Sequence, residues 1–553
     1  MLSTLLFAQA TTTADKLPGW GAIIALGLFI AASVWLGMLA QRVVERSQFI
    51  QGYFQGNRGL GPWAIALTAT VQSGGTFMGF PSLVYTYGWI VALWIGSYMV
   101  VPITGFALLG KRVAQISRRT GAVTVPDLFR ARFASPTAGL VCSLLIIVFM
   151  TIMMLAQFKA GATVMKEAWP LAVASSPAGA TGPTWWPSQW PYLVGLVVFS
   201  LAVVGYTAIG GFLAAVWTDL LQSVMMFAGV TVLACLVLTK AGGLEAGTKR
   251  AIEHAGPQFA TGPGLKVQKD AEGNIQEIAF LPLTMAFSMF VFWPFAGTAN
   301  PASVVRVMAC KNTAVLRRSI FLLAIYNMGI YLPLIAICIC GRGLMPDLGK
   351  ESDAIVPRLA LSLTEGIPLG SWLSGLILAA PFGAIMATVS CFLLVIASGL
   401  VRDVYQRFLN PAATEYELRR LTYVTMALIG LIAMLLNINP VEKLQMLVTF
   451  SSGCAASAFL VPTAMMCYWR RATAGGVISA MLAGSATAFS LNMAGLVISI
   501  VNKSGFVPYN LLGFEPIVWG LAVSLLAGIT ASLLTAPPDE KLVSKLFDAP
   551  EPA

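Results

Sequence analysis

The sequence predicts an all-α polytopic membrane protein, and three observations support this fold class. Hydrophobic residues make up 57% of the chain and charged residues only 10%, whereas a soluble globular protein carries roughly 25% charged residues. The mean hydropathy is +0.80. Apolar runs about 20 residues long, the length that crosses a bilayer as a helix, recur along the whole chain.

Counting these runs gives about thirteen expected transmembrane helices, separated by polar connections. They lie near 20–41, 62–86, 89–110, 137–165, 190–209, 213–239, 278–300, 318–341, 371–401, 420–437, 444–467, 473–500 and 515–536. The segment 111–136 is predicted as an amphipathic helix on the membrane surface. The long connections 240–278 and 342–370 are expected to form lids or short surface helices.

The formal net charge of +11 comes from basic residues that fall mainly in the short connections. This is the positive-inside pattern of a membrane protein rather than the basic face of a nucleic-acid-binding protein. It predicts a multi-pass protein of a plasma membrane, specifically a bacterial inner membrane, with its N-terminus outside and its C-terminus in the cytoplasm. The same rule places Arg306 in a cytoplasmic connection. The lipid bilayer is thus an expected partner, and nucleic acid is not.

The cysteines carry no sign of a metal or disulfide framework. Most of the eight lie inside apolar runs, none belongs to a CxxC pair, and the chain has a single histidine. They are predicted to be small buried hydrophobic residues. Neither a zinc or haem site nor an organic cofactor is expected.

Two of the expected spans are interrupted by helix-breaking residues. The first contains Gln72-Ser73-Gly74-Gly75, and the second contains the run from Trp293 to Pro301. Broken backbone is tolerated at membrane depth only where it is buried in protein or lines a wet cavity. In transporters such breaks mark the binding site.

The order of the spans suggests an inverted repeat. Each broken span opens a group of five, and because five is odd the two groups have opposite orientations in the bilayer. The expected organisation is a five-plus-five repeat with additional spans, as follows: an exposed tail at 1–19, a first span at 20–41, one repeat at 62–239, another at 278–467, two further spans at 473–536 and a cytoplasmic tail at 537–553.

A few polar residues inside the spans are candidates for chemistry. Asp219 is an acid near mid-depth, so it is either a functional group with a cation or proton as partner or a hydrogen-bonded acid that joins two helices. Thr388 and Ser390 lie in a small-residue stretch, where they either support close helix packing or contribute to a sodium site.

Three further residues inside the expected spans are candidates. Met153 and Gln157 are four residues apart and share one helix face. Trp293 adjoins the second break, where either a packing role or stacking against a solute is possible.

Three segments resemble the sodium:solute symporter family, in particular its proline and pantothenate branches. They are Tyr53-Phe-Gln-Gly-Asn-Arg-Gly-Leu-Gly-Pro62, Tyr206-Thr-Ala-Ile-Gly-Gly-Phe-Leu-Ala-Ala-Val-Trp-Thr-Asp-Leu-Leu-Gln222 and Ala379-Ala-Pro-Phe-Gly-Ala-Ile-Met-Ala-Thr388. The resemblance extends over essentially all spans. It implies the inverted five-plus-five helix bundle and transport of a small solute together with sodium.

The resemblance also implies a set of site residues. Sodium would bind the carbonyls of Ala69, Gln72 and Ala384 and the hydroxyl of Thr388, with Ser73, Asp219 and Ser390 in support. The implied solute-binding residues are Gly74, Gly75, Met153, Gln157, Trp293 and Gly297. The family usually has two adjacent hydroxyl residues where this chain has Ala387-Thr388, so one sodium ligand is missing. Water or Ser390 would supply the missing oxygen, or the site would bind sodium more weakly. Alternatively, protons would drive transport.

Proline carriers of the family have aromatic residues at the positions of Met153, Trp293 and Gly297. Only Trp293 is aromatic here, which predicts a more open pocket with an incomplete aromatic cage and argues against proline as the solute. The implied solute is an organic acid such as pantothenate or a monocarboxylate, or an amino acid.

The sequence therefore predicts a secondary active transporter that takes up a small organic solute with sodium by alternating access, without catalytic residues. The alternatives are a proton-coupled or facilitative carrier on the same fold, or a membrane sensor built on a transporter scaffold. A membrane enzyme is disfavoured because no metal cluster or nucleophile–base arrangement is evident, and a channel because no continuous polar stripe is present.

Overall fold

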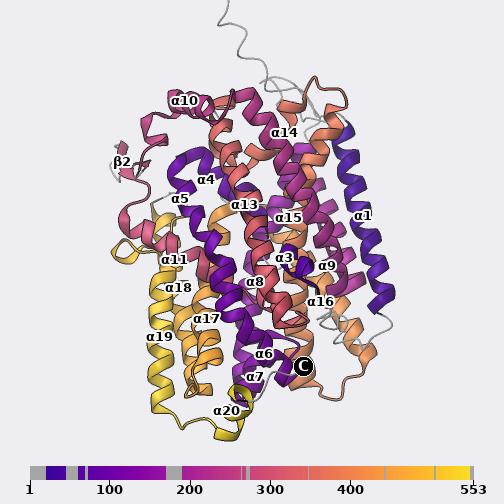
Figure 1. Ribbon diagram of the computed structural model, residues 1–553, viewed down its shortest axis with the longest axis vertical. Helices are drawn as coiled ribbons and strands as arrows, with labels where there is room; N and C mark the ends of the chain where they lie inside the picture. The colour runs from indigo at the N-terminus through magenta and orange to yellow at the C-terminus, as the bar shows by residue number, and fades with distance from the viewer. Residues whose placement is uncertain are drawn as a thin grey trace, which may run out of the picture.

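The protein is a bundle of long apolar helices (Figure 1). The computed structural model describes residues 20–44, 60–68, 72–169, 190–262, 264–269, 275–346, 348–440, 444–502 and 506–548. Within these ranges, ten helices are long and apolar enough to cross a membrane. The all-α membrane class predicted from composition is thereby confirmed.

The elements follow one another along the chain as helices of three kinds and one pair of strands. The α-helices are α1 (Trp20–Val44), α3 (Pro62–Thr68), α4 (Phe80–Tyr87), α5 (Trp89–Gly96), α6 (Lys111–Thr120), α7 (Val125–Phe133), α8 (Pro136–Ala168), α9 (Trp190–Ala241), α10 (Leu244–Ala255), α11 (Leu283–Ala299), α12 (Pro301–Met308), α13 (Thr313–Leu344), α14 (Ile355–Thr364), α15 (Gly370–Ser398), α16 (Glu415–Leu436), α17 (Leu444–Tyr468), α18 (Ala474–Val501), α19 (Pro516–Leu534) and α20 (Glu540–Phe547). Turns of π-helix form η2 (Gly75–Gly79), η4 (Pro102–Gly110) and η7 (Gly399–Leu409), and short 3₁₀ turns form η3 (Ser97–Val100), η5 (Pro257–Phe259), η6 (Gly349–Ala354) and η8 (Leu511–Gly513). The strands are β1 (Leu265–Lys269) and β2 (Ile275–Ala279).

The predicted count of thirteen spans is not confirmed. The spans expected at 190–209 and 213–239 are both present in α9, as two helices that meet at Gly211, where the backbone is non-helical (φ 59°, ψ −146°). A positive φ of this kind is accessible to glycine at little strain. The span expected at 62–86 is divided into helices too short to cross the bilayer alone. The span expected at 278–300 forms one helix of 17 residues, α11, which contains Pro294 and ends at Ala299.

Both predicted helix breaks are present. In the first, α3 ends at Thr68, Gln72 and Ser73 are non-helical, and the chain continues as π-helix η2 and then α4. In the second, α11 ends at Ala299 and the extended backbone of Asn300 (φ −64°, ψ 117°) separates it from α12. The Asn300 side chain accepts a hydrogen bond from the Ala302 backbone N–H at 3.0 Å and so caps α12.

Smaller elements gather at the two ends of the bundle (Figure 1). At one end the connections predicted as lids contain α10, η6 and α14, together with the antiparallel pair β1–β2, which was not predicted. At the other end the predicted amphipathic segment 111–136 forms two short helices, α6 and α7, instead of one. A left-handed Gly121 (φ 71°) ends α6, and α20 lies beside α7.

The core that positions the site is formed by α8, α9, α15 and α17. In α15 every residue from Ile377 to Ser398 is buried. Long stretches of the other three helices pack around it, and many small residues permit the close approach. Exposed leucine, valine and phenylalanine side chains on the outer helices suit contact with acyl chains.

Candidate functional site

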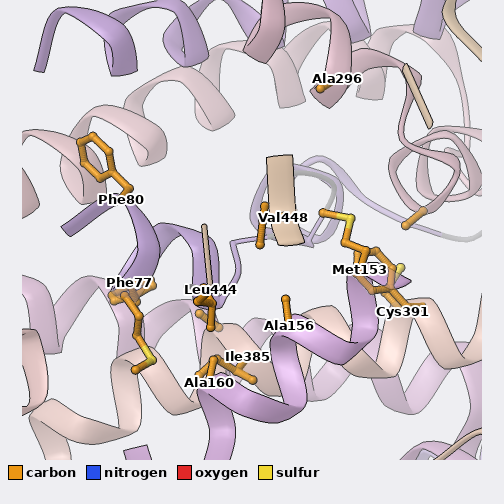
Figure 2. Close-up of a cluster of buried hydrophobic side chains, with 14 of the residues drawn as sticks. Phe77, Phe80, Met153, Ala156, Ala160, Ala296, Ile385, Cys391, Leu444 and Val448 are labelled. Carbon is orange, nitrogen blue, oxygen red and sulfur yellow. The ribbon is translucent and has the colours of Figure 1, made fainter. Parts of the chain in front are cut away.

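Specific hydrogen bonds hold the interrupted backbone of the first break against the core. The Gly74 N–H donates to Oε1 of Gln157 on α8 at 2.8 Å. A Cβ at position 74 would lie 2.6 Å from the Cβ of Ala160 and 3.4 Å from the Cγ1 of Ile385. Figure 2 shows Ala160 and Ile385 side by side in this buried cluster. Glycine is therefore required for the broken segment to pack between α8 and α15.

Three oxygens predicted to hold a cation converge where this segment meets α15. The Thr388 hydroxyl lies 2.7 Å from the Gln72 carbonyl oxygen and 2.9 Å from the Ala384 carbonyl oxygen. All three residues are nearly or fully inaccessible to solvent. Hydroxyl and carbonyl oxygens released by a broken helix are suitable ligands for a hard monovalent cation. The fourth predicted ligand, Ala69, lies outside the described residues.

The supporting hydroxyls predicted from the sequence are engaged locally. Ser73 Oγ accepts a hydrogen bond from the Gly75 N–H at 3.1 Å. Ser390 Oγ donates to the Ala387 carbonyl at 3.0 Å within α15. In this conformation Ser390 therefore binds its own helix and does not supply the oxygen that Ala387 lacks.

Asp219 pairs with Arg306, which the positive-inside rule wrongly places in a cytoplasmic connection. Its Oδ2 lies 2.5 Å from Nη2 of Arg306, and each side chain is only 2% exposed. Arg306 is thus not part of a solvated cytoplasmic connection, because α12 packs into the bundle after the second break. A carboxylate and a guanidinium buried together avoid the large penalty of burying either charge alone.

The ion pair is connected to α15 one helical turn from the predicted cation ligands. Arg306 also donates to the Sγ of Cys391, three residues beyond Thr388. The Asp219 Oδ1 and Arg306 Nε atoms are buried and make no hydrogen bond within the described part of the chain. Such incompletely satisfied buried charges are a weak source of stability, which favours a functional role for the pair.

A cavity of about 60 Å³ adjoins the broken segment. Four of the predicted solute-binding residues line it: Gly75, Met153, Trp293 and Gly297. Ser73, predicted to support the cation site, lines it too. Gly74 and Gln157 are not part of its wall and instead hold the adjoining backbone in place.

The cavity wall is richer in aromatic side chains than the sequence predicted. The ring centroids of Trp94 and Tyr98 each lie 5.9 Å from the ring centroid of Trp293. Tyr331 lies 5.1 Å from Tyr98 and 5.9 Å from Phe80 by the same measure. The expected incomplete aromatic cage is therefore wrong, since α4, α5, η3 and α13 supply rings that the positions of Met153 and Gly297 do not.

Some polar atoms of the wall have no hydrogen-bond partner in the part of the chain that the structure describes. The indole Nε1 of Trp94, the indole Nε1 of Trp293 and the Oε1 of Gln445 are buried and make no hydrogen bond among the described residues. The lining side chains include serine, threonine and asparagine, and none of the described ones is charged. Buried polar atoms are normally hydrogen-bonded, so these groups are available to a solute or to water.

Sequence reasoning missed Arg306 and the additional aromatic residues. The pairing of Arg306 with Asp219 could have been suspected from the sequence. A buried acid requires a cation, and Arg306 follows the second break by only a few residues. Trp94, Tyr98 and Tyr331 carried no such signal, since aromatic residues are common in membrane helices.

Comparisons with known proteins agree with this geometry. The model of the sodium:solute symporter family matches residues 53–176 and 188–484. The sodium/pantothenate symporter of Escherichia coli is 30% identical over 515 residues, which cover 91% of this chain and 95% of that protein. The osmoregulated proline transporter of Bacillus subtilis is 27% identical, with 96% and 98% covered.

Solved structures show the same fold at low sequence identity. A sodium-coupled sialic acid symporter in a substrate-bound, outward-open state matches with a TM-score of 0.67 at 20% identity and covers 94% of this chain and 99% of that one. A nucleobase-cation symporter matches with a TM-score of 0.51 at 15% identity, with 90% and 98% covered. This likeness supports the inverted five-plus-five helix bundle with two broken helices. The chain therefore belongs to the sodium:solute symporter family, and it is a membrane transporter that couples the uptake of a solute to sodium.

Proposed function

We propose that sodium binds between the first broken helix and α15. Its ligands are the carbonyl oxygens of Ala69, Gln72 and Ala384 and the hydroxyl of Thr388. The proposal is supported by the 2.7 Å and 2.9 Å distances that already join the last three. When sodium binds, the Thr388 hydroxyl turns its lone pairs to the ion and gives up its bond to a carbonyl. Ser73, Asp219 and Ser390 support the site without being ligands.

The solute occupies the cavity lined by Trp94, Trp293 and Gln445. Among the described residues the two indole N–H donors are unpaired and the wall is uncharged. A carboxylate is the chemical group that best satisfies such donors, and such a wall suits a compact polar body. We therefore favour a small organic acid, which includes pantothenate and monocarboxylates, over a cationic solute. An amino acid is the second solute class that this wall accommodates.

The proposed coupling between sodium and the solute is inferred from the position of residues 72–75. Gln72 faces Thr388 through its carbonyl, whereas Ser73 and Gly75 line the solute cavity. A cation and a solute on opposite sides of one short backbone segment each stabilise the same arrangement of that segment. By linkage, each then raises the affinity of the other.

The proposed setting is a bacterial inner membrane, with the N-terminus outside and the end that carries α6, α7 and α20 in the cytoplasm. The chain acts there as a carrier, without a catalytic site and without an organic cofactor. The partners required for activity are the solute, sodium and the bilayer.

Uptake into proteoliposomes tests the coupling. A screen of small acids and amino acids for thermal stabilisation, with and without sodium, first selects the solute. Uptake of that solute is then measured with and without an inward sodium gradient. Thr388→Ala should raise the sodium concentration for half-maximal uptake by about tenfold, the effect of roughly 1.4 kcal/mol, whereas Thr388→Ser should not. Equal uptake with and without the gradient would reject sodium coupling.

One observation favours a proton-coupled or facilitative carrier as the second candidate. Ala387 offers no hydroxyl, and Ser390 is bonded within its own helix. A proton gradient that drives uptake in the absence of sodium would establish this alternative.

A further inference from the structure

A second cavity, of about 370 Å³, opens between α6, α7, the start of α8 and η7. Three arginines line it, Arg130, Arg402 and Arg407, together with one carboxylate, that of Asp127. The described part of its wall therefore carries two positive charges in excess. None of these residues belongs to the sodium or solute site, and the transport mechanism above does not use them.

The carboxylate fixes two of the arginines in place. Asp127 is 6% exposed, and its Oδ2 accepts from Nε of Arg402 at 3.1 Å while its Oδ1 accepts from Nη2 of Arg407 at 3.2 Å. The Arg402 side chain is only 13% exposed. Asp403, the neighbouring acid, accepts instead from the Thr124 hydroxyl at 2.8 Å and is not part of the cavity wall.

Arg130 completes the basic wall from α7. It follows Asp127 by three residues, so the two side chains share a helix face. Within the described residues it makes no ion pair, in contrast to Arg402 and Arg407. Guanidinium groups held in fixed positions with spare N–H donors are suited to the oxygens of a phosphate group.

The surroundings of the cavity favour a lipid over a soluble phosphate. Pro136, at its rim, begins a helix whose exposed positions 136, 144 and 148 continue from the cavity into the apolar span, with Leu144 and Val148 each about half exposed. Two other apolar side chains, Phe408 and the 72% exposed Leu409, directly follow Arg407. Acyl chains can therefore lie against apolar surface while a headgroup occupies the basic cavity.

We propose that this cavity binds the headgroup of an anionic phospholipid carrying two phosphate charges, such as diphosphatidylglycerol. Two excess positive charges match such a headgroup better than they match a zwitterionic one. Basic pockets between membrane helices on the cytoplasmic side are suited to this lipid class. Because η7 continues α15, which carries Thr388, the bound lipid would tie the inner end of that helix to α7 and α8.

Native mass spectrometry of the detergent-purified protein tests the proposal. Diphosphatidylglycerol and phosphatidylethanolamine with the same acyl chains are titrated against the wild type, Arg130→Gln and Arg317→Gln. Arg317 is an exposed arginine at the start of α13, outside this cavity, and serves as the control for loss of charge. Arg130→Gln should weaken diphosphatidylglycerol binding about fivefold, while Arg317→Gln and the phosphatidylethanolamine titrations should show no change.

Three results would overturn the proposal. These are equal diphosphatidylglycerol binding by the wild type and Arg130→Gln, equally tight binding of phosphatidylethanolamine, and displacement of the lipid by millimolar inorganic phosphate. The last would assign the cavity to a soluble phosphate. If Arg130→Gln does not yield folded protein, Arg407→Gln provides a second variant. The Arg407 side chain is 37% exposed.

Discussion

The buried pair of Asp219 and Arg306 provides the sharpest test of the tertiary arrangement. The joined atoms are 2.5 Å apart, and both side chains are 2% exposed. Removing one member of such a pair leaves the other charge buried, at a cost of about 3–5 kcal/mol in the free energy of unfolding. We therefore expect Asp219→Asn and Arg306→Gln each to destabilise the protein by about this amount.

The two single variants should differ in a predictable direction. After Arg306→Gln the remaining carboxylate can be neutralised by taking up a proton. After Asp219→Asn the remaining guanidinium stays charged, because arginine cannot be deprotonated in proteins. Asp219→Asn should therefore be the more damaging of the two. The double variant buries no charge and should cost clearly less than the sum of the singles.

Unfolding titrations with SDS in mixed micelles measure these differences for all four proteins, with Arg317→Gln as an exposed control. The double-mutant cycle then gives the coupling energy of the pair. Additive effects, or single losses below about 1 kcal/mol, would contradict the burial and pairing described above.

Three further predictions concern the site and the outer loops. Ala387→Ser should lower the sodium concentration for half-maximal uptake, measured in proteoliposomes, because it restores a hydroxyl beside Thr388; an unchanged value would place the missing oxygen elsewhere. Gly74→Ala should reduce both thermal stability and transport, because its Cβ would lie 2.6 Å from a side-chain carbon of α8. Gly61→Ala should change neither, because its Cβ would meet no atom of the described residues within 4 Å. Burial raises the pKa of Glu351, but its ion pair with Arg358 outweighs this effect, and the net shift is downward from 4.5. A carboxyl group whose pKa is lower in the folded than in the unfolded protein stabilises the fold at pH values above the unfolded pKa. The melting temperature of Glu351→Gln should therefore fall slightly below that of the wild type at pH 7, by the equivalent of at most about 1 kcal/mol, and this difference should vanish as the pH drops below 4.5. A difference in melting temperature that does not depend on pH would refute the ion-pair explanation.

The sequence alone determined the class of the protein and the places where its helices break. Apolar composition and run length are local properties, and they decide whether a segment can enter a bilayer whatever its neighbours are. Residues such as Gly74, Gly75 and Pro301 act on the backbone locally too, so the two interruptions were predictable. Thr388 was a candidate from the residues alone, and the family resemblance added Gln72 and Ala384. The folded chain brings the oxygens of all three within hydrogen-bonding distance.

Only the tertiary structure decided which distant residues meet. Arg306 pairs with Asp219 across 87 positions of sequence, and neither residue type nor spacing encodes that contact. Trp94, Tyr98 and Tyr331 enclose the cavity beside Trp293 because separate helices cross there. The basic wall around Asp127 likewise requires α7 and η7 to lie together. Contacts of this kind depend on how helices pack, a property of the whole bundle, whereas insertion and helix breaking depend on each segment by itself.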